Sequence, residues 1–286
     1  MLQWGASYLS EKGFDESRLT VELLLSHVLK LKRIQLYTNF DRPLDDGELA
    51  SFKALFQRRL QHEPLQYILG TTEFMGLEFN VDRRVLIPRP ETEAVVEEAI
   101  RFINENFGGQ APRLLDIGTG SGCIAISLAH AIRTANVLAI DLSKEILDIA
   151  TANAGKNGVA DEVEFAVRDL FNSEEGDFRG EFYLVVSNPP YISQSDFAHV
   201  QPEIRDYEPA IATTDGGDGL KFYRRIARVA ASWLVPGGAV IVEHGYNQAD
   251  AVAEIFSNMG WPELRSFKDY SGIPRGLVAR NPEAVQ

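Results

Sequence analysis

The residues best suited to chemistry in this chain are Asn188-Pro189-Pro190-Tyr191. They follow an apolar run, residues 182–186, that is typical of a buried strand. Because proline lacks an N–H and fixes φ near about −65°, the two prolines must end this strand in a stiff, extended turn. In open α/β sheets, ligands sit at the carboxyl ends of the strands. There the Asn188 side-chain oxygen and the Pro189 carbonyl offer two acceptors to a substrate –NH2 group, and the Tyr191 ring can cover a flat face. The alternative for these four residues alone is a rigid loop that only ends a strand.

A glycine-rich loop lies upstream of this turn. A short apolar run, residues 113–117, leads into Gly118-Thr119-Gly120-Ser121-Gly122 and then into an apolar helical face. Glycines at a strand-to-helix turn allow a ligand to approach the backbone closely. The next apolar run ends at Asp141, about 20 residues beyond the glycines, where a carboxylate can accept both hydroxyls of a ribose. Nicotinamide dehydrogenases and S-adenosylmethionine-dependent methyltransferases share this arrangement.

Asp116, directly before the glycine loop, favours one of these two classes. A carboxylate at that point repels a pyrophosphate, but it does not repel the cationic sulfonium and amino group of S-adenosylmethionine. Cys123 occupies the position where the dinucleotide fingerprint has a small residue. Because cysteine is itself small, this position distinguishes only weakly between the dehydrogenases and the methyltransferases. The glycine loop, Asp116, Asp141 and the Asn-Pro-Pro-Tyr turn together indicate a methyltransferase that uses S-adenosylmethionine.

Composition is ordinary for a globular protein. The chain has 286 residues, 45% hydrophobic and 24% charged, which suits one large or two unequal domains. No apolar stretch approaches the ~18 residues of a membrane span, and the N-terminus does not resemble a signal peptide. A single cysteine excludes an intramolecular disulfide framework and fits a reducing cytoplasm, where we expect the protein. The five histidines lack metal-ligand spacing, so we expect no metal.

The formal net charge of −13 bears on the substrate. Proteins that grip nucleic acid usually present a basic patch, because neutralising phosphates supplies most of the affinity. Basic pairs such as Arg58-Arg59 stand among acidic neighbours and are typical of a solvated helix face. We therefore expect a protein substrate, no direct nucleic-acid partner and no membrane partner. Nothing indicates an obligate interface, so we expect a monomer.

Hydrophobic periodicity divides the chain into three parts. Apolar residues at three- and four-residue steps predict a helical bundle over residues 1–72, with a capping box from Asp45 to Glu48. Alternating apolar residues around Gly76 predict a β-hairpin linker over 73–87. Residues 88–286 alternate strands and helices as a doubly wound parallel sheet does, with a long loop over 192–219 that could close over a substrate.

With these motifs assembled, the chain resembles the peptide-chain release factor glutamine methyltransferases, the HemK/PrmC family. The resemblance runs through both domains in the family's order, in the segments Pro64-Leu65-Gln66-Tyr67 with Gly70, Glu73-Phe74, Leu86-Ile87-Pro88-Arg89-Pro90-Glu91-Thr92-Glu93, residues 116–122, residues 187–191, Glu208-Pro209, residues 215–220 and Glu243-His244-Gly245. The glycine loop and the Asn-Pro-Pro-Tyr turn are shared with N6-adenine DNA and guanine-N2 RNA methyltransferases. The run over residues 86–93 and the helical N-terminal domain separate this family from those.

The resemblance implies a Rossmann-like class I methyltransferase domain behind a small helical domain. That helical domain shows no catalytic constellation, so we expect it to recognise the substrate, and a packing appendage is the alternative. The resemblance also implies methylation of the side-chain amide nitrogen of the glutamine in the Gly-Gly-Gln loop of peptide-chain release factors, with S-adenosylmethionine as cofactor. The residues it assigns to the cofactor are Gly118, Thr119, Gly120, Ser121 and Gly122 around the methionine part, Asp141 at the ribose, and Asp169 and Leu170 beside the adenine, with Asn188 also in contact. The family often has an aromatic residue where Leu170 stands. The residues assigned to the glutamine are Asn188, which is also the catalytic residue, Pro189, Pro190 and Tyr191.

Two other functional classes stay open. The same turn can grip an exocyclic amino group of adenine or guanine in nucleic acid, although the acidic charge balance disfavours that substrate. A non-catalytic module that only binds S-adenosylmethionine is the other class, and an intact Asn188 turn beside an intact glycine loop disfavours it. No base is assigned for the proton that the product must lose. Glu93, Glu243 and His244 are candidates by position only, and for each we favour a structural hydrogen-bonding role.

The chain also contains Gly108-Gly109-Gln110, the tripeptide that the implied substrate presents. Self-methylation of Gln110 is one interpretation. A polar loop before a strand is the interpretation that we favour.

Overall fold

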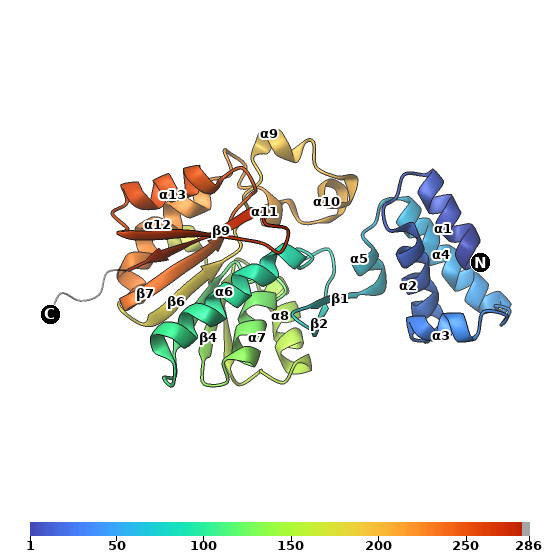
Figure 1. Cartoon of the computed structure of the whole chain (residues 1–286), viewed down its shortest axis with the longest axis horizontal. Helices are drawn as coiled ribbons and strands as arrows, with labels where there is room; N and C mark the ends of the chain where they lie inside the picture. Colours follow the sequence, from blue (N-terminus) through green and yellow to red (C-terminus); the bar gives the residue numbers. More distant parts are fainter. Residues whose placement is uncertain (282–286) are drawn as a thin grey trace. The chain divides into compact units, whose positions relative to one another are not determined.

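The computed structural model describes residues 1–281, and the chain forms two compact units (Figure 1). One unit contains residues 1–70 together with Pro202–Tyr207, and the other contains residues 71–201 and the chain from Glu208 onward. The predicted division into 1–72, 73–87 and 88–286 did not include the contribution of residues 202–207 to the helical unit. Residues 282–286 of the predicted methyltransferase domain lie outside the described part. Within residues 1–281, no helix combines the length and apolar character needed to span a membrane.

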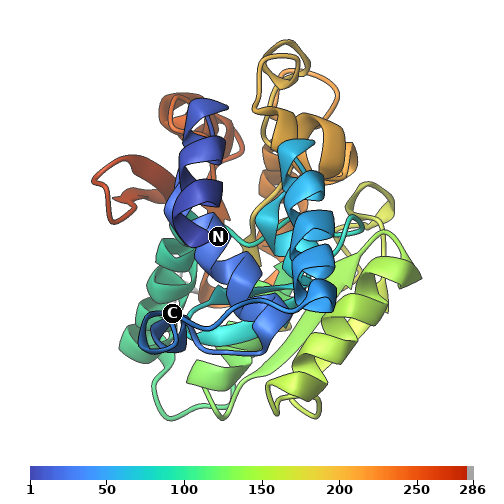
Figure 2. The same cartoon turned by 90° about the vertical axis from the view of Figure 1, so that its right-hand side faces the viewer.

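The helical unit is built around one small apolar core, and Figure 2 shows its helices from residues 2–69, in blue to cyan, packed side by side. Its helices are α1 (Leu2–Glu11), α2 (Ser17–Leu29), α3 (Arg33–Thr38), α4 (Asp46–Leu60), α5 (Leu65–Leu69) and α10 (Pro202–Tyr207). The predicted capping box is confirmed: Glu48 N–H donates to Asp45 Oδ1 at 2.7 Å, and Asp45 N–H donates to Glu48 Oε2 at 3.1 Å. Leu9, Val21 and Phe52 are fully buried in the core.

Helix α10 joins the helical unit through polar contacts. Glu203 accepts a hydrogen bond from Arg59 at 3.0 Å and lies 3.2 Å from His62 Nδ1. The Tyr207 hydroxyl donates to the Gln61 carbonyl at 2.6 Å. These long-range contacts explain why residues 202–207 could not be assigned to this unit from local sequence patterns.

The second unit begins with the predicted hairpin and continues into a seven-stranded sheet of order β5-β4-β3-β6-β7-β9-β8. The hairpin consists of β1 (Thr71–Phe74) and β2 (Leu77–Asn80). The sheet strands are β3 (Arg113–Ile117), β4 (Asn136–Asp141), β5 (Val163–Val167), β6 (Phe182–Ser187), β7 (Leu234–Glu243), β8 (Glu263–Lys268) and β9 (Pro274–Arg280). Strands β3 to β7 pair in parallel, whereas β9 runs antiparallel to both β7 and β8. The prediction of a parallel sheet is therefore correct except at β9, because the short link over residues 269–273 cannot carry a crossover between parallel strands.

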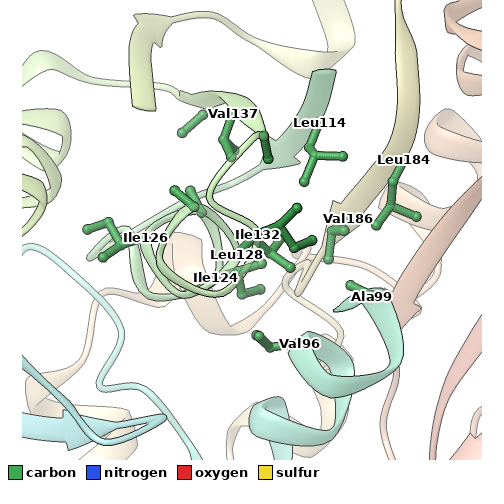
Figure 3. Packing of buried hydrophobic residues seen from close by; sticks show 14 of the residues in the cluster. Val96, Ala99, Leu114, Ile124, Ile126, Leu128, Ile132, Val137, Leu184 and Val186 are labelled. Atoms are coloured by element: carbon green, nitrogen blue, oxygen red, sulfur yellow. The ribbon is translucent and has the colours of Figure 1, made fainter. Parts of the chain in front are cut away.

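Helices cover both faces of this sheet because buried side chains alternate along its strands. Leu114, Leu184 and Val186 point to the face covered by α6 (Pro90–Phe107) and α7 (Cys123–Ala131), as Figure 3 shows. Helix α8 (Lys144–Lys156) contributes Ala154 to the same cluster. The alternate residues, such as Leu115 and Val185, pack with α12 (Lys221–Trp233) and α13 (Ala249–Asn258) on the other face. Because β3 to β7 run in parallel, their carboxyl ends meet at one edge of the sheet.

The segment predicted as a long loop over 192–219 contains short helices. Besides α10 these are α9 (Gln194–Phe197) and α11 (Ala210–Thr213), and a further short 3-10 turn, Leu170–Asn172, follows β5. The segment returns to the sheet at Gly219, whose φ is +79°. A Cβ on this residue would lie 2.3 Å from the Tyr191 carbonyl oxygen, so only glycine fits against the Asn-Pro-Pro-Tyr turn.

Asn153 on α8 joins the hairpin to the glycine loop, and its loss should destabilise the methyltransferase unit. Its side chain is fully buried, accepts from Asn80 N–H at 2.7 Å, and donates to the carbonyls of Asn80 and Ser121 at 3.1 and 2.9 Å. Asn153→Ala should lower the free energy of unfolding by about 2–4 kcal/mol, because buried partners lose their hydrogen bonds. Denaturant titration measures this loss. Asn157→Ala removes two hydrogen bonds in the same region, one exposed and one partly buried, so it should cost less than about 1 kcal/mol and is the matched control.

Candidate active site

The glycine loop and the Asn-Pro-Pro-Tyr turn are neighbours because β3 and β6 pair in register. Ile117 is opposite Ser187, and the Ser187 hydroxyl donates to the Ile117 carbonyl at 2.8 Å. The next residue on each strand therefore begins the loop on one side and the turn on the other. A cleft of about 830 Å³, including space open to solvent, lies at this edge. The predicted site residues that line it are Gly118, Gly120, Asp141, Asp169, Leu170, Asn188, Pro189 and Pro190.

The other predicted residues lie behind the cleft lining. Thr119 and Ser121 are buried. Gly122 has a φ of +83°, and a Cβ there would lie 3.2 Å from Ala150 Cβ, so glycine lets α8 pack closely against the start of α7. The Tyr191 ring packs partly buried against the core on the α12 face. These four positions support the loop and the turn from within.

The glycine loop is anchored to the end of β4. The N–H groups of Gly118 and Thr119 donate to the Ile140 carbonyl at 2.9 and 3.1 Å. Gly120 N–H donates to Asp141 Oδ2 at 2.8 Å, and Leu142 N–H donates to Asp141 Oδ1 at 2.7 Å. Gly118 and Gly120 have φ of +73° and +56°, and a Cβ on either would meet no atom within 4 Å. The loop thus exposes bare backbone to the cleft while Asp141 holds its shape.

Asp116 is a buried carboxylate directly behind this loop. Its Oδ2 accepts from the Thr119 hydroxyl at 2.7 Å and from Ala125 N–H at 3.3 Å, whereas its Oδ1 has no hydrogen-bond partner among residues 1–281. Burial raises the pKa of Asp116 to about 7, and the hydrogen bonds from Thr119 and Ala125 oppose that rise. An unpaired buried carboxylate oxygen fits a cationic group at the glycine loop and fits a pyrophosphate poorly. The residues present therefore suit S-adenosylmethionine.

The other end of the cleft is aromatic. Phe171, which follows Leu170, lines the cleft with Phe222 of α12, and the two rings meet edge to face with centroids 5.1 Å apart. Asp169 accepts from Phe171 N–H at 2.8 Å and so holds this turn. Sequence analysis named Leu170 and missed both phenylalanines. The neighbouring position of Phe171 was an available signal, whereas Phe222 reaches the cleft only through the packing of α12.

A hydrogen-bonded chain lies beneath Asn188. The Asn188 amide Nδ2 donates to the Thr92 hydroxyl at 3.1 Å, and Thr92 donates to Glu243 Oε2 at 2.6 Å. The Tyr191 hydroxyl donates to the other carboxylate oxygen, Glu243 Oε1, at 3.1 Å. Burial raises the pKa of Glu243 to about 7, while Thr92, Arg275 and Tyr191 oppose the rise. Sequence analysis did not connect Thr92 with Asn188, because 96 residues separate them.

The candidate bases have structural partners. Glu93 accepts from Met75 N–H at 2.7 Å and thereby holds the hairpin turn. His244 is fully buried with Nδ1 2.8 Å from the Gly245 carbonyl, and burial lowers its pKa. Burial also raises the pKa of Cys123 to about 12, which agrees with a packing role rather than a nucleophile. These contacts fit the structural interpretation of Glu93, His244 and Cys123.

Gln110 lies at the opposite edge of the sheet from the cleft. It precedes β3, whereas the glycine loop follows β3. A five-residue strand spans about 16 Å, so Gln110 cannot reach the cleft of its own chain. Methylation of Gln110 within one molecule is excluded by this separation.

The raised pKa of Asp116 predicts a pH-dependent stability that Asp116→Asn removes. The ordinary pKa of an aspartate is 3.8, so between about pH 4 and 7 the folded state holds a proton that the unfolded state has lost. The contribution of Asp116 to the free energy of unfolding is therefore greatest at low pH and falls as pH rises through about 7. The free energy of unfolding of the wild type, minus that of the variant, should decrease by about 2–3 kcal/mol from pH 5 to pH 8. Chemical denaturation across this range measures it, and parallel profiles would contradict a raised pKa. Glu243 and His244 titrate in both proteins, so their contributions cancel in this difference.

Comparison with known proteins gives a consistent result over the whole chain. Residues 1–70 match the PrmC N-terminal domain, and residues 93–205 match the methyltransferase small domain. The release factor glutamine methyltransferase of Geobacter sulfurreducens is 46% identical over 280 residues, covering 98% of this chain and 95% of that protein. The enzyme of the same name from Chlorobaculum tepidum is 42% identical, covering 97% and 95%. The crystal structure of a methyltransferase from Pyrococcus furiosus, 19% identical, matches with a TM-score of 0.51 over 79% of this chain and 98% of that chain, which shows the fold alone. The chain therefore belongs to the family of release factor glutamine methyltransferases, on a class I methyltransferase fold.

Proposed function

We propose that this protein transfers a methyl group from S-adenosylmethionine to the side-chain amide nitrogen (N5) of the glutamine in the Gly-Gly-Gln motif of peptide-chain release factors. The observation that carries the proposal is that Asn188 and Pro189 line the same cleft as Gly118, Gly120 and Asp141. An acceptor pair for an amide –NH2 group thus stands beside a glycine loop suited to a cationic cofactor. The proposal places the enzyme in the cytoplasm as a monomer, with the helical unit contributing to substrate recognition.

The residues that would hold the cofactor surround the loop. The backbone over residues 118–122 would enclose the methionine part, and Asp141 would accept hydrogen bonds from the ribose hydroxyls with lone pairs left free by Gly120 and Leu142. Asp169 and Leu170 would border the adenine, and Phe171 and Phe222 would supply the aromatic surface that Leu170 lacks. When bound, S-adenosylmethionine would supply an electrophilic methyl carbon on a sulfonium sulfur.

The protein's own contribution is to orient and polarise the amide. An amide nitrogen is a poor nucleophile, because its lone pair is delocalised into the carbonyl. Asn188 Oδ1 and the Pro189 carbonyl would accept hydrogen bonds from its two N–H groups, which would fix the orientation of the nitrogen and favour the positive charge that develops on it. Tyr191 supports the Asn-Pro-Pro-Tyr turn from behind the cleft lining, where its ring packs against the core and its hydroxyl donates to Glu243.

Asn188→Ala should abolish most activity without loss of the cofactor. We expect turnover to fall by at least ~10²-fold, since both orientation and charge stabilisation are lost, while the dissociation constant for S-adenosylmethionine stays nearly unchanged. Single-turnover methylation of a release factor and calorimetric titration measure the two quantities. Near wild-type methylation by this variant would refute the assignment of Asn188.

Asp141→Ala should weaken cofactor binding. Loss of charge-assisted hydrogen bonds to the ribose should raise the dissociation constant by about tenfold or more. Asp141→Asn, which keeps the size and one acceptor, is the control and should lose less. Unchanged affinity of the alanine variant by calorimetry would argue against the ribose role.

The substrate itself is tested with labelled S-adenosylmethionine. The purified protein is incubated with a release factor, with the same factor carrying Gln→Ala in its Gly-Gly-Gln motif, and with single-stranded RNA and DNA. We expect label only in the unmodified release factor. Label in RNA or DNA but not in protein would support the nucleic-acid N-methyltransferase instead.

A further inference from the structure

The orientation of the Asn188 side chain is set by two residues that do not line the cleft. Asn188, Thr92 and Glu243 form a continuous hydrogen-bonded chain with donor–acceptor distances of 3.1 and 2.6 Å. The side chains of Thr92 and Glu243 come from different elements, the first turn of α6 and the carboxyl end of β7. Both residues are 1% exposed, so water cannot replace either partner.

The direction of this chain follows from the ionised form of Glu243, which the hydrogen bonds from Thr92 and Tyr191 and the charge of Arg275 favour against burial. The ionised carboxylate can only accept hydrogen bonds, so the Thr92 hydroxyl donates its single proton to Glu243. The Thr92 oxygen then has only lone pairs to offer and can accept from Asn188 Nδ2 but not donate to Oδ1. The amide nitrogen of Asn188 is therefore held toward Thr92, and its oxygen is turned away. For ionised Glu243 this assignment follows from the donor and acceptor count and does not depend on how the amide oxygen and nitrogen were distinguished.

The carboxylate end of the chain is itself held in place. Tyr191 donates to Glu243 Oε1, and the Tyr223 hydroxyl donates to the Glu243 main-chain carbonyl at 2.8 Å. The positive charge of Arg275 on β9 favours the ionised form of Glu243, whereas the negative charge of Glu91 on α6 disfavours it. Glu243 thus fixes both ends of the Asn-Pro-Pro-Tyr turn, Asn188 through Thr92 and the Tyr191 ring directly.

A buried carboxylate that only fills space destabilises the fold relative to an apolar side chain. Removing such a group from water is unfavourable, and apolar residues of similar size often give a more stable core. Asn188 needs a fixed direction because its two ends have opposite hydrogen-bonding character. Rotated by half a turn, its –NH2 would face the –NH2 of an amide substrate.

We propose that Thr92 and Glu243 are positioning residues that hold the Asn188 amide with its oxygen toward the substrate nitrogen. The effect on catalysis rests on the function proposed above, whereas the orientation of the amide can be measured in the protein without substrate.

The discriminating variants are Thr92→Val and Thr92→Ser. Valine keeps the shape but removes the hydroxyl, which frees the Asn188 amide to rotate, and serine restores the hydroxyl. We expect kcat for Thr92→Val to fall by about 10- to 100-fold, with the dissociation constant for S-adenosylmethionine and the KM for the release factor changed by less than about threefold, and kcat for Thr92→Ser to recover to within about threefold of wild type. Thr134→Val is the matched control, because its hydroxyl donates to the Gln110 carbonyl at the far edge of the sheet.

The orientation is read directly from the Asn188 side-chain amide in protein labelled with 15N-asparagine. Its signals are identified by their loss in Asn188→Ala. Hydrogen exchange of this –NH2 group should be slow in the wild type and in Thr92→Ser, and at least about tenfold faster in Thr92→Val. Unfolding midpoints confirm that each variant is folded.

The outcomes separate the two proposals. Fast exchange in the wild type, or equal exchange and equal kcat in the wild type and Thr92→Val, would overturn the positioning role. A valine variant whose defect serine does not rescue would overturn it as well. If the wild type shows slow, Thr92-dependent exchange but methylates no release factor, the positioning holds and the proposed function fails.

Discussion

The register between β3 and β6 is the constraint on which the site depends. Pairing of Ile117 with Ser187 brings the glycine loop and the Asn-Pro-Pro-Tyr turn to the same point of the sheet edge, although about 70 residues separate them in the chain. Both strands are buried on both faces. A shift of one residue in their pairing would move each apolar side chain to the opposite face of the sheet, where it would not fit the cluster packed there. Core packing therefore determines the distance between the two halves of the cleft.

Around that edge the protein keeps carboxylates where water is scarce. Burial raises the pKa values of Asp116, Asp141 and Glu243, and each of the three is held by donors from a neighbouring residue or strand. In an environment of low polarity such groups orient hydrogen bonds and attract cations more strongly than they would at the surface. These buried carboxylates lie at the site proposed to bind a cation and align an amide.

Much of this arrangement could be predicted from local patterns. The strand before Gly118, the strand before Asn188 and the capping box at Asp45 each follow from a short run of residues whose conformational preferences agree with one another. The three short helices after the turn were missed because α9 and α11 have four residues each and α10 has six, too few for a hydrophobic period. The antiparallel direction of β9 was missed because strand pairing is a property of the whole sheet.

The sequence by itself determined the residue types of the site, since proline, glycine and aspartate at these spacings restrict the backbone and the chemistry locally. It also determined the family, through motifs that run from Pro64 to Gly245. Only the tertiary structure decided which groups support Asn188 and which aromatic rings line the cleft. Thr92, Phe222 and Glu243 come from α6, α12 and β7, and their contacts with the site arise from helix-to-sheet packing. Side chains that meet through packing carry no spacing signal along the chain, because the distance between them is set by the core rather than by the number of residues that separate them.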